Sequence, residues 1–179
     1  MMQDMDALRK EIAQYRQDGA DECVEWAKKK WVRVMCDYFA CGVWEPDRAA
    51  TLPHLLPISA ELIARILDWQ KVCDSLEPWD TATEDIRYEA WASEGLAIAV
   101  DMKRQLPDWI IVYHDERRTS PQPTPEELLI LERASTKSSS ADRAIDARLR
   151  FIDRYRPWFE YEITPEVART GKPPDNYPK

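Results

Sequence analysis

Two strand-like segments separated by two long helical segments constrain the fold of this chain more than any other feature. Residues 31–38 alternate between apolar and other side chains, and residues 109–114 form an almost unbroken apolar run, as strands do. Residues 59–75 and 83–106 instead repeat apolar side chains at intervals of three and four, which predicts amphipathic helices. This order predicts a predominantly helical α+β fold, in which helices cover a small sheet of about three strands.

The segments between the two strands also carry boundary signals. Ser59, which follows Pro57, is the predicted N-cap of the first long helix, and Pro107 ends the second. The two helices could serve as a crossover between parallel neighbouring strands, but the sequence leaves the strand direction open. The apolar run at 109–114 predicts a central strand that is buried on both faces.

The chain is expected to form a single domain. With 179 residues, of which 44% are hydrophobic, it can bury one core. We place a core at residues 31–116, an N-terminal helical extension at 1–30, a C-terminal helical and strand extension at 117–169, and a flexible tail at 170–179.

The two extensions carry further predicted elements. Residues 3–17 predict a helix, and Asp21 predicts the cap of a second one. Beyond the core, Thr124 begins a predicted helix and residues 141–155 predict another. Residues 158–163 alternate and predict a strand at a sheet edge, because their glutamates face outward. An edge strand leaves homodimerisation open.

The net charge of −8 limits the classes of partner. An acidic chain is repelled by the phosphates of nucleic acids and by anionic membranes, so we expect neither as a partner. The charge favours a basic protein partner, although solubility explains it more simply. Only four residues are glycine, which argues against a glycine-rich phosphate loop, and we expect no cofactor.

The chain is expected to be cytoplasmic. No apolar stretch approaches the roughly 18 residues that span a bilayer. The first residues lack the basic and apolar regions of a signal peptide. We therefore expect reduced, buried thiols, and the spacing of the cysteines and the two histidines does not match a zinc site. The cysteines are Cys23, Cys36, Cys41 and Cys73, and the histidines are His54 and His114.

An acidic stretch links the two long helices and enters the second. Between residues 77 and 94, six acidic side chains are accompanied by one base, Arg87. Such a surface attracts basic partners, and tryptophans in neighbouring links are candidate anchors. A solvated acidic face and tryptophans folded over the core are the simpler alternatives. The candidate partner-binding residues are Trp44, Glu77, Trp79, Asp80, Glu84, Asp85 and Glu89.

Asp37 and His114 are the weak candidates for catalysis. Each lies at the end of a predicted strand, where ligands gather in parallel sheets. If the two strands are parallel neighbours, these side chains could meet and perform the acid–base chemistry of a small hydrolase or transferase. A solvated strand end is the simpler explanation.

The segment from residue 31 to 116 has a recognisable order of short motifs. A strand ends in Asp37-Tyr38, a loop reaches Trp44, a helix opens after Leu56-Pro57-Ile58-Ser59, the next helix contains Glu94-Gly95, and the closing strand ends at Tyr113. This order resembles small bacterial proteins of unassigned function and immunity-type proteins that neutralise bacterial toxins. The resemblance covers about half of the chain. It implies a bacterial cytosolic protein and supplies no catalytic residue.

The leading hypothesis is therefore a non-enzymatic inhibitor, similar to an immunity protein or antitoxin, whose acidic surface binds a basic toxin. An alternative is a phage or mobile-element protein that blocks a host defence complex. Both need only an acidic binding face, so the sequence does not separate them.

Overall fold

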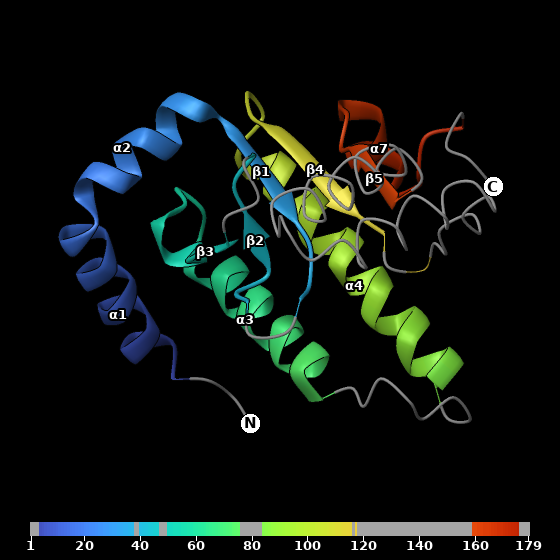
Figure 1. Ribbon diagram of the computed structural model, residues 1–179, viewed down its shortest axis with the longest axis horizontal. Coiled ribbons are helices and arrows are strands. Elements are labelled where there is room, and N and C mark those ends of the chain that lie inside the picture. Colours follow the sequence, from blue (N-terminus) through green and yellow to red (C-terminus); the bar gives the residue numbers. More distant parts are fainter. Residues whose placement is uncertain are drawn as a thin grey trace, which may run out of the picture.

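The computed structural model describes residues 4–37, 40–46, 50–75, 84–115, 117 and 159–175, with residues 84–87 described by their backbone (Figure 1). The elements in chain order are α1 (Met5–Asp18), α2 (Ala20–Lys29), β1 (Trp31–Val34), β2 (Val43–Trp44), β3 (Ala50–Thr51), the 3-10 helix η1 (Pro53–Leu55), α3 (Ala60–Ser75), α4 (Glu84–Gln105), β4 (Ile110–His114), β5 (Glu160–Glu162) and α7 (Pro165–Thr170).

The strands form one mixed sheet in the order β3-β2-β1-β4-β5. Strands β1 and β4 are parallel, with Val34 opposite Tyr113, and the other neighbours are antiparallel. The α+β class is confirmed, but the sheet has five strands instead of about three. The two additional strands lie between the first predicted strand and the first long helix, where no strand was predicted, and each has two residues. Such a strand is too short to show alternation in sequence.

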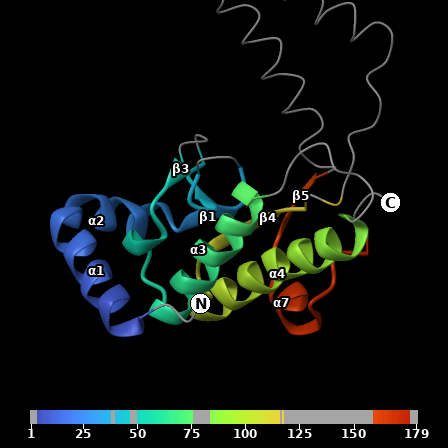
Figure 2. The ribbon, with the colours of Figure 1, turned by 90° about the horizontal axis from the view of Figure 1, so that it is seen from below.

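Helices α3 and α4 cover one face of the sheet (Figure 2). Val32, Val34 and Ile111 point into this helical side and are fully buried. Strand β4 lies inside the sheet, between β1 and β5. The prediction that it is buried on both faces is wrong, because Ile110, on the face away from these helices, is 46% exposed.

A tryptophan pair joins α3 to α4. The rings of Trp69 and Trp91 are stacked with centroids 5.4 Å apart. The indole of Trp69 donates a hydrogen bond to the carbonyl of Trp91 at 2.9 Å, and the indole of Trp91 donates to the carbonyl of Trp69 at 3.2 Å. Gly95 makes room for this pair, because a Cβ atom at that position would lie 2.6 Å from Cζ2 of Trp69.

Helices α1 and α2 are packed into the same hydrophobic core as the sheet. Leu8 and Ile12 of α1 are buried, and Trp26 of α2 is stacked on Trp109 with ring centroids 6.3 Å apart. The predicted cap at Asp21 is wrong. Helix α2 starts at Ala20, so Asp21 lies in its first turn. A carboxylate there stabilises the helix by its interaction with the positive end of the helix dipole.

The C-terminal extension adds the edge strand and a short helix. Strand β5 lies at the sheet edge, as predicted, and Tyr161 and Ile163 are buried. Helix α7 was not predicted, and its cap is Thr164, which accepts a hydrogen bond from the amide of Val167. The predicted helices at Thr124 and 141–155 lie outside the described residues. Within the described part of the chain, no helix has the length and apolar character to cross a membrane.

The cysteines depart from the prediction of reduced thiols. Cys36, just after β1, and Cys73, in the last turn of α3, form a disulfide. Their Cα atoms are 6.6 Å apart, although 37 positions separate them in sequence. The pairing depends on how α3 crosses the sheet, which sequence spacing does not reveal. Cys23 and Cys41 are free thiols.

Candidate partner-binding surface

A cleft of about 610 Å³ lies beside α4. Its floor is apolar and comes from Leu96, Ala97 and Val100 of α4. Its opposite wall includes Gly171 and Pro173, which follow α7. The remaining lining residues are polar or charged: Ser93, Asp101, Arg104, Asp115 and Arg117. An apolar floor with a charged rim is the usual composition of a protein–protein contact.

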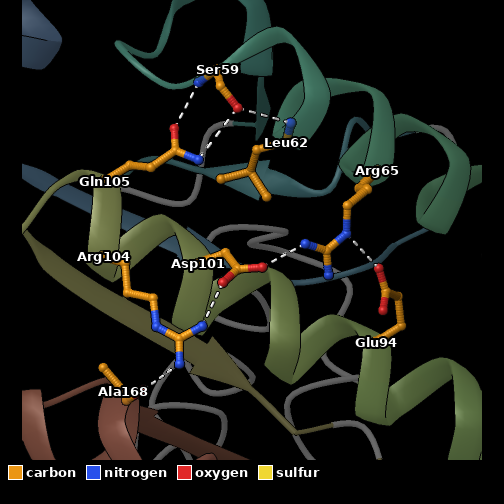
Figure 3. Close-up of polar contacts among 8 residues, drawn as sticks. All are labelled: Ser59, Leu62, Arg65, Glu94, Asp101, Arg104, Gln105 and Ala168. Carbon is orange, nitrogen blue, oxygen red and sulfur yellow. Dashed lines mark hydrogen bonds and ion pairs between the residues drawn. The ribbon is translucent and has the colours of Figure 1, made fainter.

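One end of the cleft is organised by Asp101 of α4 (Figure 3). Its carboxylate accepts a hydrogen bond from Arg65 of α3 at 2.5 Å and another from Arg104 at 2.7 Å. Arg65 also donates to Glu94 at 2.9 Å, and Arg104 donates to the carbonyl of Ala168 in α7 at 3.0 Å. This charged network ties α3, α4 and α7 together at the rim.

The network shifts the pKa values of Asp101 and Arg65. Burial alone would raise the pKa of Asp101, but the hydrogen bonds from Arg65 and Arg104 outweigh burial and lower it. The hydrogen bond to Glu94 raises the pKa of Arg65. Burial lowers this pKa by a smaller amount, so the pKa stays above its ordinary value. Asp101 and Arg65 therefore remain charged near neutral pH.

A smaller hollow of about 180 Å³ lies on the other side of Asp101 and Arg104, between α3 and the end of α4. Ser59 is the N-cap of α3, as predicted, and its hydroxyl accepts a hydrogen bond from the amide of Leu62 at 3.2 Å. Gln105 in turn accepts from the amide of Ser59 at 2.7 Å. The ends of α3 and α4 are thus fixed to each other, which holds Asp101 and Arg104 between the two hollows.

The far rim of the cleft carries an ion pair that follows β4. Arg117 donates to both carboxylate oxygens of Asp115 at 2.7 Å, and Asp115 is almost fully buried. The carboxylate of Asp115 raises the pKa of Arg117. Glu89 of α4 lies 3.9 Å from the same guanidinium group. The rim therefore presents both signs of charge around the apolar floor.

The part of the chain that holds the floor of this cleft also matches a known protein family. Residues 30–116 match the family described as Serratia CdiI immunity protein-like. The match confirms the resemblance to immunity-type proteins that the sequence motifs indicated. No curated protein matches the chain.

The segment that matches the CdiI-like family contains β1 to β4, α3 and α4. It therefore supplies the Arg65–Asp101 contact and the α4 floor of the cleft. Helices α1, α2 and α7 and strand β5 lie outside the match. The cleft wall that Gly171 and Pro173 form is an addition to the CdiI-like segment.

The predicted partner-binding residues fall into three groups. Glu77, Trp79 and Asp80 lie outside the described residues. Glu84 and Asp85 lie in the first turn of α4, and Glu89 is exposed on the same helix. Asp101 and Arg104 of the CdiI-like segment were not predicted, although their spacing of three on a helix is a local signal for an ion pair.

Trp44 lies away from the acidic part of α4. It is opposite Arg33 in the β1–β2 ladder, so both side chains are on the sheet face that α3 and α4 do not cover. Its indole donates a hydrogen bond to the carbonyl of Met35 at 3.0 Å, and the side chain is half-buried. Trp44 and Glu89 therefore do not share one face of the sheet.

The catalytic candidates have different surroundings. Strands β1 and β4 are parallel neighbours, as the hypothesis requires, and Asp37 is exposed beyond the end of β1. His114, however, has Glu160 of β5 as a carboxylate neighbour at 3.5 Å, and its ring is stacked on Phe159. The sequence did not indicate this contact because Glu160 lies 46 positions away. A catalytic pair of Asp37 and His114 stays a prediction.

His54, the other histidine, is buried in η1. Its ring lies against Tyr15, with centroids 4.6 Å apart, and its Nε2 atom is 3.9 Å from the Glu11 carboxylate. Burial lowers the pKa of His54. The Glu11 carboxylate has a smaller effect that raises this pKa, and Arg16 has a smaller effect that lowers it. The neutral imidazole is therefore the form that the folded chain favours.

This burial predicts that acid destabilises the fold through His54. A folded-state pKa below the ordinary value of about 6.5 means that the contribution is fully present above that pH. It is lost as the pH falls from about 6.5 through the lower folded-state pKa. Urea unfolding at pH 7.5 and 5.0 should show a larger loss for the natural chain than for His54→Phe, which cannot titrate. Equal losses in the two chains would contradict the prediction.

Proposed function

We propose that this chain is an immunity-type protein that binds a bacterial toxin and neutralises it. The observation that carries the proposal is the match of residues 30–116 to the CdiI immunity protein-like family. The matched segment contains the α4 side of the cleft, a surface with the composition of a protein contact. We also propose the cytoplasm as its location, as the sequence predicts.

We place the toxin contact along the exposed side of α4. The first half of the helix supplies acidic residues, of which Glu89 has an exposed carboxylate. The second half supplies Asp101 and Arg104, which the Arg65 and Ala168 contacts hold in place. Side chains already fixed before binding lose less conformational freedom when a partner docks. The apolar floor between them would bury a protruding side chain of the toxin.

The acidic half of this surface favours a basic toxin. The chain carries a net charge of −8, so its long-range field attracts a positively charged protein and speeds the encounter. Such attraction weakens as salt is added, because the Debye length shrinks from about 10 Å at 0.1 M to about 3 Å at 1 M. The association rate with a basic toxin should therefore fall with ionic strength.

The proposal is tested by co-expression of the full chain with the toxin encoded beside its gene. The chain should restore growth of cells that express this toxin and should co-purify with it at a stoichiometric ratio. A chain that neither protects nor co-purifies would refute the proposed function.

The contact surface is tested by charge reversal at Glu89. We expect Glu89→Lys to weaken binding of that toxin at least tenfold, about 1.4 kcal/mol, because it places a cation in the acidic half of the surface. The matched control is Glu25→Lys on α2. Its side chain is 59% exposed, close to the 62% of the Glu89 side chain. The measurement is the Kd by calorimetry. Equal effects of the two charge reversals on the Kd would mean that the toxin contacts another surface. They would not contradict the proposed immunity function.

A further inference from the structure

The end of α3 is held against the loop that follows β1. Cys73 is bonded to Cys36, and Gln70 donates a hydrogen bond from its side chain to the carbonyl of Asp37 at 2.7 Å. On the return side of the loop, Gly42 packs on Ile66, whose Cγ2 atom would lie 3.0 Å from a Cβ atom placed there. Of these contacts, the disulfide is the one that can be made and broken chemically.

The remaining anchors of α3 lie earlier in the helix. Ile63, Ile66 and Trp69 are buried in the core and do not depend on the disulfide. After Trp69, Val72 is exposed, and so are Asp74 and Ser75. The buried residues of α3 after Trp69 are Gln70 and Cys73. Breaking the bond would therefore loosen the last turn of α3 and the loop, while the rest of the helix stays packed.

We propose that the Cys36–Cys73 bond is a redox-sensitive clasp between the end of α3 and the loop after β1. A small-molecule thiol opens it in two exchange steps. The first thiolate attacks one sulfur, forms a mixed disulfide with it and releases the other cysteine as a thiol. A second thiol then releases the first cysteine, so that two thiols are oxidised to one disulfide and both cysteines are reduced. A small-molecule disulfide closes the clasp by the reverse steps.

The surroundings of the Cys36–Cys73 bond favour exchange with a small-molecule thiol over exchange with the neighbouring free thiol of Cys41. Cys73 lies two residues before the end of α3, where fraying of the terminal turn gives a reductant access to it. Cys41 lies in the same loop, but burial, and to a smaller extent Asp74, raise the pKa of its thiol. A protonated thiol is a poor nucleophile, so Cys41 does not rearrange the bond. In a reducing compartment the clasp opens, and under oxidising conditions it closes.

Hydrogen exchange of the full chain tests the clasp. We compare the oxidised protein with protein treated with glutathione, at labelling times of seconds to minutes, when local opening dominates. Amides in residues 70–75 and in the described part of the loop, residues 35–37 and 40–42, should exchange at least tenfold faster after reduction. Amides of Val32 to Val34 and of the buried part of α4 should stay protected in both states.

Two variants make the test specific. Cys73→Ser should exchange as the reduced protein does in either buffer, whereas Cys41→Ser should respond to glutathione as the natural chain does. In differential alkylation of the oxidised sample, Cys36 and Cys73 should be protected from the alkylating reagent. The two free cysteines should react with it. Unchanged exchange on reduction, loss of protection throughout the chain, or a bond that involves Cys41 would each overturn the proposal.

Discussion

A chain that begins at residue 30, where the match to the CdiI-like family starts, is expected to lose most of its folded stability. The deletion removes Leu8, Ile12 and Trp26, all of which are buried in the core. Deleting large buried side chains costs about 2–5 kcal/mol each, and the sum approaches the about 5–15 kcal/mol that stabilises a whole domain. The loss of Trp26 also uncovers the face of Trp109 on which it is stacked.

Urea unfolding followed by circular dichroism measures this effect, with a chain that begins at Asp4 as the matched control. That control keeps the cap of α1, because Asp4 accepts hydrogen bonds from the amides of Asp6 and Ala7. It should unfold at the same urea concentration as the full chain. If the chain from residue 30 did so too, the N-terminal helices would be an addition to a self-sufficient core.

Arg16 of α1 gives a second reason to expect that the stability of the fold depends on the N-terminal helices. Its guanidinium donates to the carbonyls of His54, Leu56 and Ile58 at 2.9, 2.6 and 3.0 Å. These carbonyls lie in η1 and in the segment between η1 and α3, inside the family match. Their partner lies outside it. The boundary of the family resemblance is therefore not the boundary of the hydrophobic core or of its polar contacts.

The elements that could be predicted from sequence are those with a local cause. Helix α3 repeats apolar side chains over 16 residues and starts after a side-chain cap at Ser59. Helix α4 runs until shortly before Pro107. Signals of this kind need no knowledge of the rest of the chain. Strands β2 and β3 owe their existence to pairing with β1 and with each other, so their two residues carry no signal of their own.

The contacts of the candidate site also divide into those with a local signal in the sequence and those without one. The Asp101–Arg104 pair is spaced three residues apart on one helix, so it could have been found from sequence. The contacts of Asp101 with Arg65 and of His114 with Glu160 join residues 36 and 46 positions apart. The sheet also separates Trp44 from Glu89, a fact that depends on which face each strand residue takes. Contacts of this kind follow from the topology.

Replacing Trp69 by alanine is expected to lower the free energy of unfolding by about 4 kcal/mol, because Trp→Ala in a core costs about 3–5 kcal/mol. The indole fills the space between α3 and α4 and is stacked on Trp91. Its loss also leaves the buried carbonyl of Trp91 without the donor that reaches it at 2.9 Å. Urea unfolding of both chains measures the difference, and a loss below about 1 kcal/mol would contradict this account of the helix interface.

A double-mutant cycle with Gly95 shows whether the indole itself is responsible. Gly95→Ala alone should cost about 1–3 kcal/mol, as overpacking does, because the new Cβ atom would meet Cζ2 and Cε2 of Trp69 at 2.6 and 3.0 Å. Trp69→Phe removes Cζ2, the nearer of the two ring atoms. Gly95→Ala should therefore cost clearly less in the Trp69→Phe background than in the natural chain. Additive costs would mean that the contact with Tyr113, at 3.1 Å, limits position 95 instead. A coupled result would show that the tryptophan pair sets the spacing of α3 and α4, and hence the reach of Arg65, one turn before Trp69, to Asp101.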